Sequence, residues 1–238
     1  MKAIILAAGM GRRLGLGLPK CLTPIVEDTT ILDLQLARLR RFVERVTLVV
    51  GHQADVIMRR HPDCEFVHNA AYETTNTAAS LALGLERVGG EDVIWVNGDV
   101  VFDPEVLARL VARGPSALAT KRCSTGDEEV KYMADADGRL TAVSKGLTDG
   151  QGEAVGVNIV RAADVGPFRE ALAGCGRQDY FERGVETALA RGVAFYVADV
   201  TDLACIEIDF PEDLAAARRL FGSLPEAARG PAAGTPAV

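Results

Sequence analysis

Cysteine pairs, long apolar runs and aromatic residues are all scarce in this sequence. Its five cysteines are scattered without a C-x-x-C pair, which predicts neither a zinc site nor a disulfide framework. No apolar run approaches the roughly 20 residues that span a bilayer. The short opening run is followed directly by Arg12 and Arg13, whereas a secretion signal carries its positive charge first. Because unpaired thiols suit a reducing compartment, we expect a cytoplasmic protein without a membrane partner.

An excess of positive charge is also missing. Lys and Arg number 26 against 33 Asp and Glu, so the formal net charge is -7 and the pI is about 5.1. Such a chain does not attract nucleic acid or an anionic membrane over a broad surface. We therefore expect no nucleic-acid partner, and any anion that binds must be held locally.

The elements that the sequence does contain follow the order of a layered α/β domain. Apolar residues make up 48% and charged residues 25% of the 238 positions, the balance of one globular domain. Short β-branched runs, apolar on both faces, alternate with helical patterns, which predicts a mainly parallel sheet covered by helices. The expected strands are 2–7, 45–51, 64–68, 92–99 and 116–122, and the expected helices are 30–42, 54–60, 76–88 and 104–114.

The alternation of buried strands and helices ends after about residue 122. Two polar-apolar strands are expected within 128–147, joined at Asp137-Gly138, a favoured hairpin turn. Beyond them, the expected strands are 153–161, 194–200 and 203–209, and the expected helices are 162–173, 180–192 and 211–221. The segment 222–238 is rich in Gly, Ala and Pro without apolar periodicity. We therefore expect one domain over 1–221 and a flexible tail over 222–238.

The opening segment LAAGMGRRLGLGLPKCL was compared with two glycine-loop motifs. A dinucleotide fingerprint needs a glycine three residues after Gly11 and an acid at the end of the next strand, and the sequence has neither. A Walker A loop is excluded because no Gly-Lys-Ser/Thr follows. What remains is a turn whose backbone N–H groups can approach phosphate oxygens, with Arg13 and Lys20 as cationic donors. The alternative is a surface loop with solvated charges.

Two aspartates end expected strands. Asp99 follows the strand at 92–99, at the kind of position where open α/β sheets bind ligands, and Asp209 ends the strand in CIEIDFPEDL. Either could instead cap a helix, although Asp103 before Pro104 fills that role better for the helix after Asp99. Two carboxylates can hold one Mg²⁺ and still leave positions for phosphate oxygens. Asp99 and Asp209 are therefore the candidate metal ligands.

A polar loop, NAAYETTNTAASL, leads into the helix expected at 76–88. Thr75, Asn76 and Thr77 could hydrogen-bond a base or a ribose. Each could also be a plain helix cap, and this alternative is strongest for Thr75 and Asn76.

Taken together and in this order, four segments resemble the nucleotidyltransferases that make NDP-sugars and related activated groups: LAAGMGRRL…PKCL, NGDV, GEAVGVNIV and IEIDFPEDL. Within that superfamily the chain is most similar to the phosphocholine cytidylyltransferase-like group, which includes phosphonate cytidylyltransferases. The resemblance covers about residues 1–221. It implies a glycosyltransferase-A-like, Rossmann-like three-layer α/β sandwich with a mixed, mainly parallel central sheet.

The resemblance also implies roles for individual residues. The family's glycine loop wraps the triphosphate, and the lysine of its P-K pair, here Lys20, contacts the phosphates of donor and acceptor. Arg13 and Lys20 are therefore the expected catalytic residues, and Asp99 and Asp209 the expected Mg²⁺ ligands. The expected nucleotide-binding residues are Leu6, Ala7, Ala8, Gly9, Gly11, Arg12, Asn76, Thr77, Ser80 and Gly98.

Two departures from the family's pattern favour a cytidylyltransferase over a sugar nucleotidyltransferase. Sugar enzymes of this family usually carry Thr or Ser where this chain has Arg12, and a Q-P-x-G-L segment where it has TNTAASL. The acceptor then belongs to the phosphocholine or phosphonate kind. Aromatic residues are only 5% of the chain, so Tyr72, Tyr132 and Trp95 give little support for a cage around a trimethylammonium group.

The acceptor is expected in the region where that alternation ends, about 122–160. Lys131 and Lys145 could bind its phosphate or phosphonate, and Glu153 could pair with a cation such as an amine. Solvated hairpin charges are the alternative for each lysine.

The expected function is that of a Mg²⁺-dependent nucleotidyltransferase. CTP is the favoured nucleoside triphosphate, and CMP is joined to a small anionic phosphonate or phospho-alcohol with release of pyrophosphate. An acceptor of this kind is already an anion near neutral pH, so it needs no general base. The alternatives are a sugar-1-phosphate or inositol-1-phosphate nucleotidyltransferase and a non-catalytic nucleotide-binding regulatory module. Association into a homodimer is left open.

Overall fold

The computed structural model describes residues 1–15 and 17–222. The side chain of Arg12 and residues 223–238 of the predicted tail lie outside the described residues. Within the described part of the chain, no helix is both long and apolar enough to cross a membrane.

Four parallel strands form the centre of the sheet, in the order β6-β1-β4-β5. The inner strands β1 and β4 and the strand β6 are buried almost throughout, which agrees with their apolar character on both faces, whereas β5 at the edge is only partly buried. Ile5, for example, pairs with Leu48 on one side and Val96 on the other. Because the four strands are parallel, their carboxyl ends lie at one edge. They are β1 (Lys2–Ala7), β4 (Val46–Val50), β5 (Glu65–His68) and β6 (Val93–Asn97).

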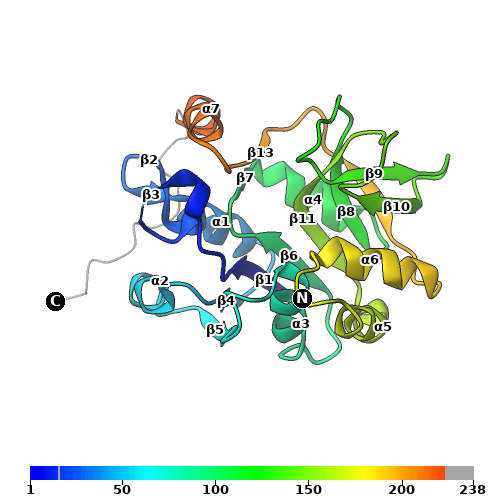
Figure 1. Cartoon of the computed structure of the whole chain (residues 1–238), viewed down its shortest axis with the longest axis horizontal. Helices are drawn as coiled ribbons and strands as arrows, with labels where there is room; N and C mark the ends of the chain where they lie inside the picture. Colours follow the sequence, from blue (N-terminus) through cyan, green and yellow to red (C-terminus); the bar gives the residue numbers. More distant parts are fainter. Residues whose placement is uncertain (16, 223–238) are drawn as a thin grey trace.

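The second half of the chain extends this sheet with antiparallel pairs (Figure 1). β11 runs antiparallel to β6, β8 and β9, β12 runs parallel to β8, and β9 and β10 form the predicted hairpin. The sheet is therefore mixed, as expected. The added strands are β8 (Ala117–Lys121), β9 (Lys131–Ala134), β10 (Leu140–Ser144), β11 (Glu153–Val160) and β12 (Tyr196–Asp199).

Helices cover both faces of the sheet and complete the expected three layers. Alternate residues of β1 point to opposite sides: Ala3 and Ile5 pack with α1, α2 and α4, whereas Ile4 and Leu6 pack with α3, α5 and α6. The first group is α1 (Ile31–Leu39), α2 (Ala54–Arg60) and α4 (Pro104–Ala112). The second group is α3 (Thr77–Leu85), α5 (Ala162–Ala173) and α6 (Phe181–Ala190).

A third, smaller core joins the two ends of the described chain. Leu14 and Ile25 pack there against Leu214 and Phe221 of α7 (Pro211–Phe221). β13 (Cys205–Glu207) pairs antiparallel with β7 (Val100–Phe102), so the segment after β13 lies beside the segment before β7. Three short strands were not predicted: β7, β2 (Pro24–Val26) and β3 (Thr29–Thr30).

Candidate functional site

The glycine loop after β1 brings Lys20 close to the end of that strand. Gly11 has φ +57°, a left-handed conformation that favours glycine. A Cβ on Gly11 would lie 3.2 Å from the Cβ of Lys20. Two short 3₁₀ turns, Arg12–Leu14 and Lys20–Leu22, follow in the chain. The glycine is therefore needed both for the turn and for the close approach of Lys20.

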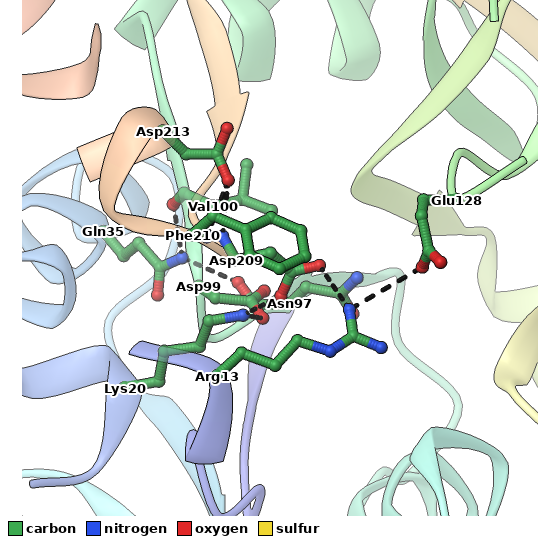
Figure 2. Close-up of polar contacts among 10 residues, drawn as sticks. All are labelled: Arg13, Lys20, Gln35, Asn97, Asp99, Val100, Glu128, Asp209, Phe210 and Asp213. Carbon is green, nitrogen blue, oxygen red and sulfur yellow. Dashed lines mark hydrogen bonds and ion pairs between the residues drawn. The ribbon is translucent and has the colours of Figure 1, made fainter. Parts of the chain in front are cut away.

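The turn after β6 presents Asp99 at the same edge. The Gly98 N–H donates to the Leu6 carbonyl at 3.0 Å, and a Cβ on Gly98 would lie 2.6 Å from that oxygen. Gln35, fully buried in α1, donates to the carbonyls of Asn97 (2.8 Å) and Val100 (2.7 Å), on either side of the turn (Figure 2). These contacts leave no room for a side chain at position 98 and fix the backbone that carries Asp99.

Lys20 lies between the two predicted metal aspartates (Figure 2). Its Nζ donates to Asp99 Oδ2 at 2.7 Å and also to Asp209 Oδ1. Arg13 Nη1 donates to Asp209 Oδ2 at 3.2 Å. Burial opposes the charged form of Lys20, but the charges and hydrogen bonds of Asp99 and Asp209 outweigh it and raise the pKa above its ordinary value. Four residues that are far apart in sequence thus form one ionic cluster.

Neither aspartate of this cluster serves as a helix cap. Asp103 caps α4, because its carboxylate accepts from the Glu105 N–H at 2.8 Å. At α7 the capping acceptor is Asp213, which accepts from the N–H groups of Asp209 (3.0 Å) and Phe210 (2.8 Å). The side chains of Asp99 and Asp209 therefore remain available for a cation.

A third carboxylate, Glu207, belongs to the same cluster and was not predicted. Glu207, Asp99 and Asp209 each offer an oxygen, and these oxygens lie within 4.8 Å of one another. Glu207 is exposed, but the protein crowded around its carboxylate, followed by the charges of Asp99 and Asp209, raises its pKa to about 8. The sequence did contain a signal for it: Glu207 and Asp209 are two residues apart in a strand-like run, a spacing that puts both on one face.

Two adjoining cavities, of about 270 and 400 Å³, open at this edge of the sheet. Most of the predicted nucleotide-binding residues line them. Leu6, Gly9, Gly98 and Asp99 line both cavities. The first cavity adds Ala8, Asn76, Thr77 and Ser80, and the second adds Ala7, Gly11 and Lys20.

The polar loop before α3 forms one wall of the first cavity. Asn76 caps α3 by accepting from the Thr77 N–H at 2.9 Å, so the capping interpretation holds for it, and it lines the cavity as well. Asn69, which was not predicted, donates to the hydroxyls of Thr75 and Ser80, both at 3.1 Å. This wall is uncharged and carries the hydrogen-bonding groups that a base or ribose requires.

The three predicted acceptor residues lie in different places. Lys145 lines the first cavity, 3.9 Å from Glu128 and 5.3 Å from the centre of the Tyr180 ring. Lys131 is buried and donates to the Lys145 carbonyl at 3.4 Å, and it lines neither of the two cavities. Glu153 lines a neighbouring cavity of about 250 Å³. Their roles toward an acceptor remain predictions.

Comparison with known protein families identifies the chain. Residues 3–155 match the model of the MobA-like NTP transferase domain. The chain belongs to this family. The match includes the glycine loop, Lys20 and Asp99, and it agrees with the nucleotidyltransferase resemblance drawn from the sequence. The MobA-like NTP transferase described here is therefore a nucleotidyltransferase.

Relatives of this NTP transferase include one protein with an assigned product. The CMP-5'-(3-aminopropyl)phosphonate synthase of Streptomyces rubellomurinus is 36% identical over 241 residues, which cover 90% of this chain and 37% of that protein. The chain thus spans little more than a third of the length of this relative.

Solved structures share the fold. The inositol-1-phosphate CTP transferase of T. maritima has a TM-score of 0.77 and 18% identity, covering 94% of this chain and 97% of the other. The CTP:phosphocholine cytidylyltransferase of Streptococcus pneumoniae has a TM-score of 0.73 and 19% identity, and the match covers 92% of this chain and 98% of the other. The expected α/β nucleotidyltransferase fold is thereby confirmed.

Proposed function

We propose that this NTP transferase is a magnesium-dependent cytidylyltransferase, which joins CMP from CTP to a small phosphonate or phospho-alcohol and releases pyrophosphate. The observation that carries the proposal is the convergence of Arg13, Lys20, Asp99 and Asp209 at the mouth of the cavities. CTP and a phosphonate acceptor are favoured because the relative that is 36% identical is a CMP-5'-(3-aminopropyl)phosphonate synthase. They are proposals for this chain, which spans only part of that protein.

The triphosphate would lie along the glycine loop. Backbone N–H groups in such a loop point at phosphate oxygens, and Arg13 and Lys20 add two cations at its end. The base and ribose would then lie against the uncharged wall formed by Asn69, Asn76 and Ser80.

The residues present fit a magnesium ion. Mg²⁺ prefers carboxylate oxygens and keeps places for phosphate and water, and Asp99 and Asp209, with Glu207 beside them, offer such oxygens. The charge balance of the cavities points the same way. Their charged lining residues are Asp99, Glu128, Glu182, Glu207, Asp209, Arg13, Lys20 and Lys145. Asp99 and Asp209 would repel a triphosphate bound beside them, so the site needs an additional cation before it can hold one.

Catalysis would consist of positioning and charge neutralisation. The acceptor oxyanion attacks the α-phosphorus of CTP in line, a bond forms between them, and the bond to the pyrophosphate breaks as that group leaves. Arg13 and Lys20 hold the phosphates in place and offset their charge, and bound Mg²⁺ supplies further charge neutralisation. No residue needs to remove a proton, because the acceptor arrives as an anion.

The same proposal assigns a catalytic domain and an acceptor-binding region to parts of the chain. We take residues 1–221 as one catalytic domain and about 122–160 as its acceptor side, because Lys145 lies in this region beside the first cavity and Glu153 lies beside a neighbouring one.

A matrix assay tests the function. Pyrophosphate release is measured for each of four nucleoside triphosphates against 2-aminoethylphosphonate, 3-aminopropylphosphonate, propylphosphonate, phosphocholine, inositol 1-phosphate and a sugar 1-phosphate, with Mg²⁺ and with EDTA. We expect release with CTP and a phosphonate, and only with Mg²⁺. Release confined to a sugar or inositol phosphate would replace the proposed acceptor class, and no release with any pair would contradict the catalytic assignment of this chain.

A further inference from the structure

Glu182, in the first turn of α6, is a buried carboxylate that the site described so far does not use. Its side chain lines the first cavity, yet the residue is only 8% exposed. Its Oε2 atom has no hydrogen-bond partner among residues 1–15 and 17–222. A buried carboxylate oxygen without a partner is costly, because it has lost its water and gained nothing in return. The position therefore calls for a hydrogen-bond donor that arrives with a ligand.

The surroundings of Glu182 are acidic. Glu128 and Glu207 line the same cavity, and Glu128 lies on the opposite side of Arg13 from Asp209 (Figure 2). Lys145 is the nearby cation, but its ammonium lies by Glu128, 3.9 Å from the carboxylate. Burial raises the pKa of Glu182 to about 7, and a hydrogen bond from its own backbone N–H and the charge of Lys145 lower it only in part. A bound cation would favour the ionised form of Glu182.

The Lys145 ammonium shows that a cation of this type fits at this end of the cavity. It lies 5.3 Å from the centre of the Tyr180 ring, within the range in which a ring face attracts an ammonium group. Tyr180 is 44% exposed, so its ring is also accessible to a ligand. The first cavity thus offers carboxylates, an aromatic face and Arg13, while Lys20 lines the adjoining cavity.

We propose that the acceptor is zwitterionic: its phosphonate or phosphate lies toward Arg13 and Lys20, and a primary ammonium at its other end donates a hydrogen bond to Glu182. This inference rests on the proposed function and specifies its substrate class. A primary ammonium is favoured over a quaternary one because the unpartnered Oε2 needs a hydrogen atom. The described residues next to Tyr180 also form no aromatic cage, since Phe181, which follows Tyr180 in the chain, is buried against Trp95 with ring centres 5.7 Å apart.

Paired substrates test the inference on the unmodified protein. The ratio of kcat/KM for 3-aminopropylphosphonate to that for propylphosphonate isolates the amine, because the two acceptors differ in nothing else. We expect a preference of roughly 10- to 100-fold for the amine, the range typical of one charge-assisted hydrogen bond. Equal use of the two acceptors, or a higher kcat/KM for phosphocholine, would overturn the inference.

A matched pair of variants assigns the effect to Glu182. Glu182→Gln keeps the shape and removes the charge, and it should reduce the preference to within about threefold. Glu186→Gln is the control: the same change one turn later on α6, where Glu186 pairs with Arg183 at 3.3 Å. It should keep the preference of the unmodified protein. If Glu182→Gln lowered kcat/KM equally for both acceptors, its role would be structural and the inference wrong.

Failure of the inference and failure of the proposed function give different results. Pyrophosphate release from CTP with propylphosphonate as readily as with the amine would leave the cytidylyltransferase in place and remove the ammonium subsite. Absence of release with every phosphonate and phospho-alcohol would overturn both. CTP binding, measured by calorimetry on Glu182→Gln and Glu186→Gln, reports whether each variant is folded.

Discussion

At the scale of the residue, Lys20 has the most concentrated set of contacts in the site. Its side chain is 15% exposed and is bonded to two carboxylates, Asp99 and Asp209, that are distant from it and from each other in the sequence. In this arrangement it neutralises Asp99 and Asp209 in the position that a divalent cation would take. If a divalent cation bound there, as proposed, the Lys20 ammonium would be free to turn toward the phosphates. In the proposal, Lys20 thus balances the aspartates when the site is empty and contacts the phosphates when the nucleotide and the cation are bound.

Replacing Lys20 tests this role. Lys20→Met should lower kcat by roughly a hundred- to a thousandfold, the loss typical of removing one group that stabilises charge in the transition state. The fold should persist, because Asp209 still pairs with Arg13 and the side chain of Asp99 is partly open to solvent. Lys2→Met is the control, since Lys2 is at the opposite end of β1 and lies 3.8 Å from Glu91. A Lys20→Met variant that merely melted earlier, with normal kcat, would make this lysine structural.

At the scale of the element, the start of α7 carries two aspartates, one with a structural role and one with a proposed role in the site. Asp213 accepts from two backbone N–H groups at the start of the helix, whereas Asp209, four residues earlier, faces Lys20 and Arg13. The two aspartates are close in sequence and chemically identical, and they face different partners. Substituting each by Asn therefore separates the two roles.

Asp213→Asn should weaken the cap and lower stability by about 1 kcal/mol, or about 2–4 °C in Tm for a domain of this size, with little change in kcat. Asp209→Asn should do the reverse: turnover falls by roughly a hundredfold or more and Tm changes little. Thermal melts and pyrophosphate-release rates on both variants check this. Near-normal turnover in Asp209→Asn would refute the proposed metal role.

Most elements could be predicted because their signals are local. The helix at 162–173 has its expected bounds, and the hairpin lies where expected, although its turn is longer than the two residues predicted: the Gly138 N–H donates to the Asp135 carbonyl, and Gly138 has φ +77°. The strands β2, β3 and β7 are two or three residues long and gain their stability from pairing, which leaves no periodic signal. The sequence also gave no sign that Glu182 lines a cavity, because a glutamate in the first turn of an amphipathic helix is usually exposed to solvent.

Only part of the site can be predicted from the sequence. Arg13, Lys20, Asp99 and Asp209 stand in recognisable motifs, but up to 196 positions separate the partners that bond to one another. Their meeting depends on β13 pairing with β7, a contact that no local pattern specifies. The predicted acceptor residues show the converse: Lys131 follows a plausible charge pattern, yet the sheet turns its ammonium toward the Lys145 carbonyl.

At the scale of the whole molecule, the fold concentrates a few cations in a chain of formal net charge -7. The cytoplasmic location and the homodimer remain predictions, because they concern what lies outside one chain. Stability, in contrast, can be argued from buried ionisable groups. The junction between α1 and α2 holds one of them, His61, which is 4% exposed and lies 3.6 Å from Asp33.

His61 should make the protein less stable in mild acid. Burial lowers its pKa below the ordinary value of 6.5; the charges of Asp33 and Asp63 oppose this shift, and those of Arg60 and Arg40 add to it. The unfolded chain therefore binds a proton near pH 6.5, where folded His61 does not, so stability falls as the pH drops from 6.5 to the folded pKa.

For each unit by which folding lowers the pKa of His61, the free energy of unfolding falls by about 1.4 kcal/mol once the pH is below the folded pKa. Urea unfolding of the native protein between pH 7.5 and 5 should show this loss, and His61→Leu, which cannot take up the proton, should show a flatter profile over the same range. Identical pH profiles for the two proteins would place the acid sensitivity in another titrating group.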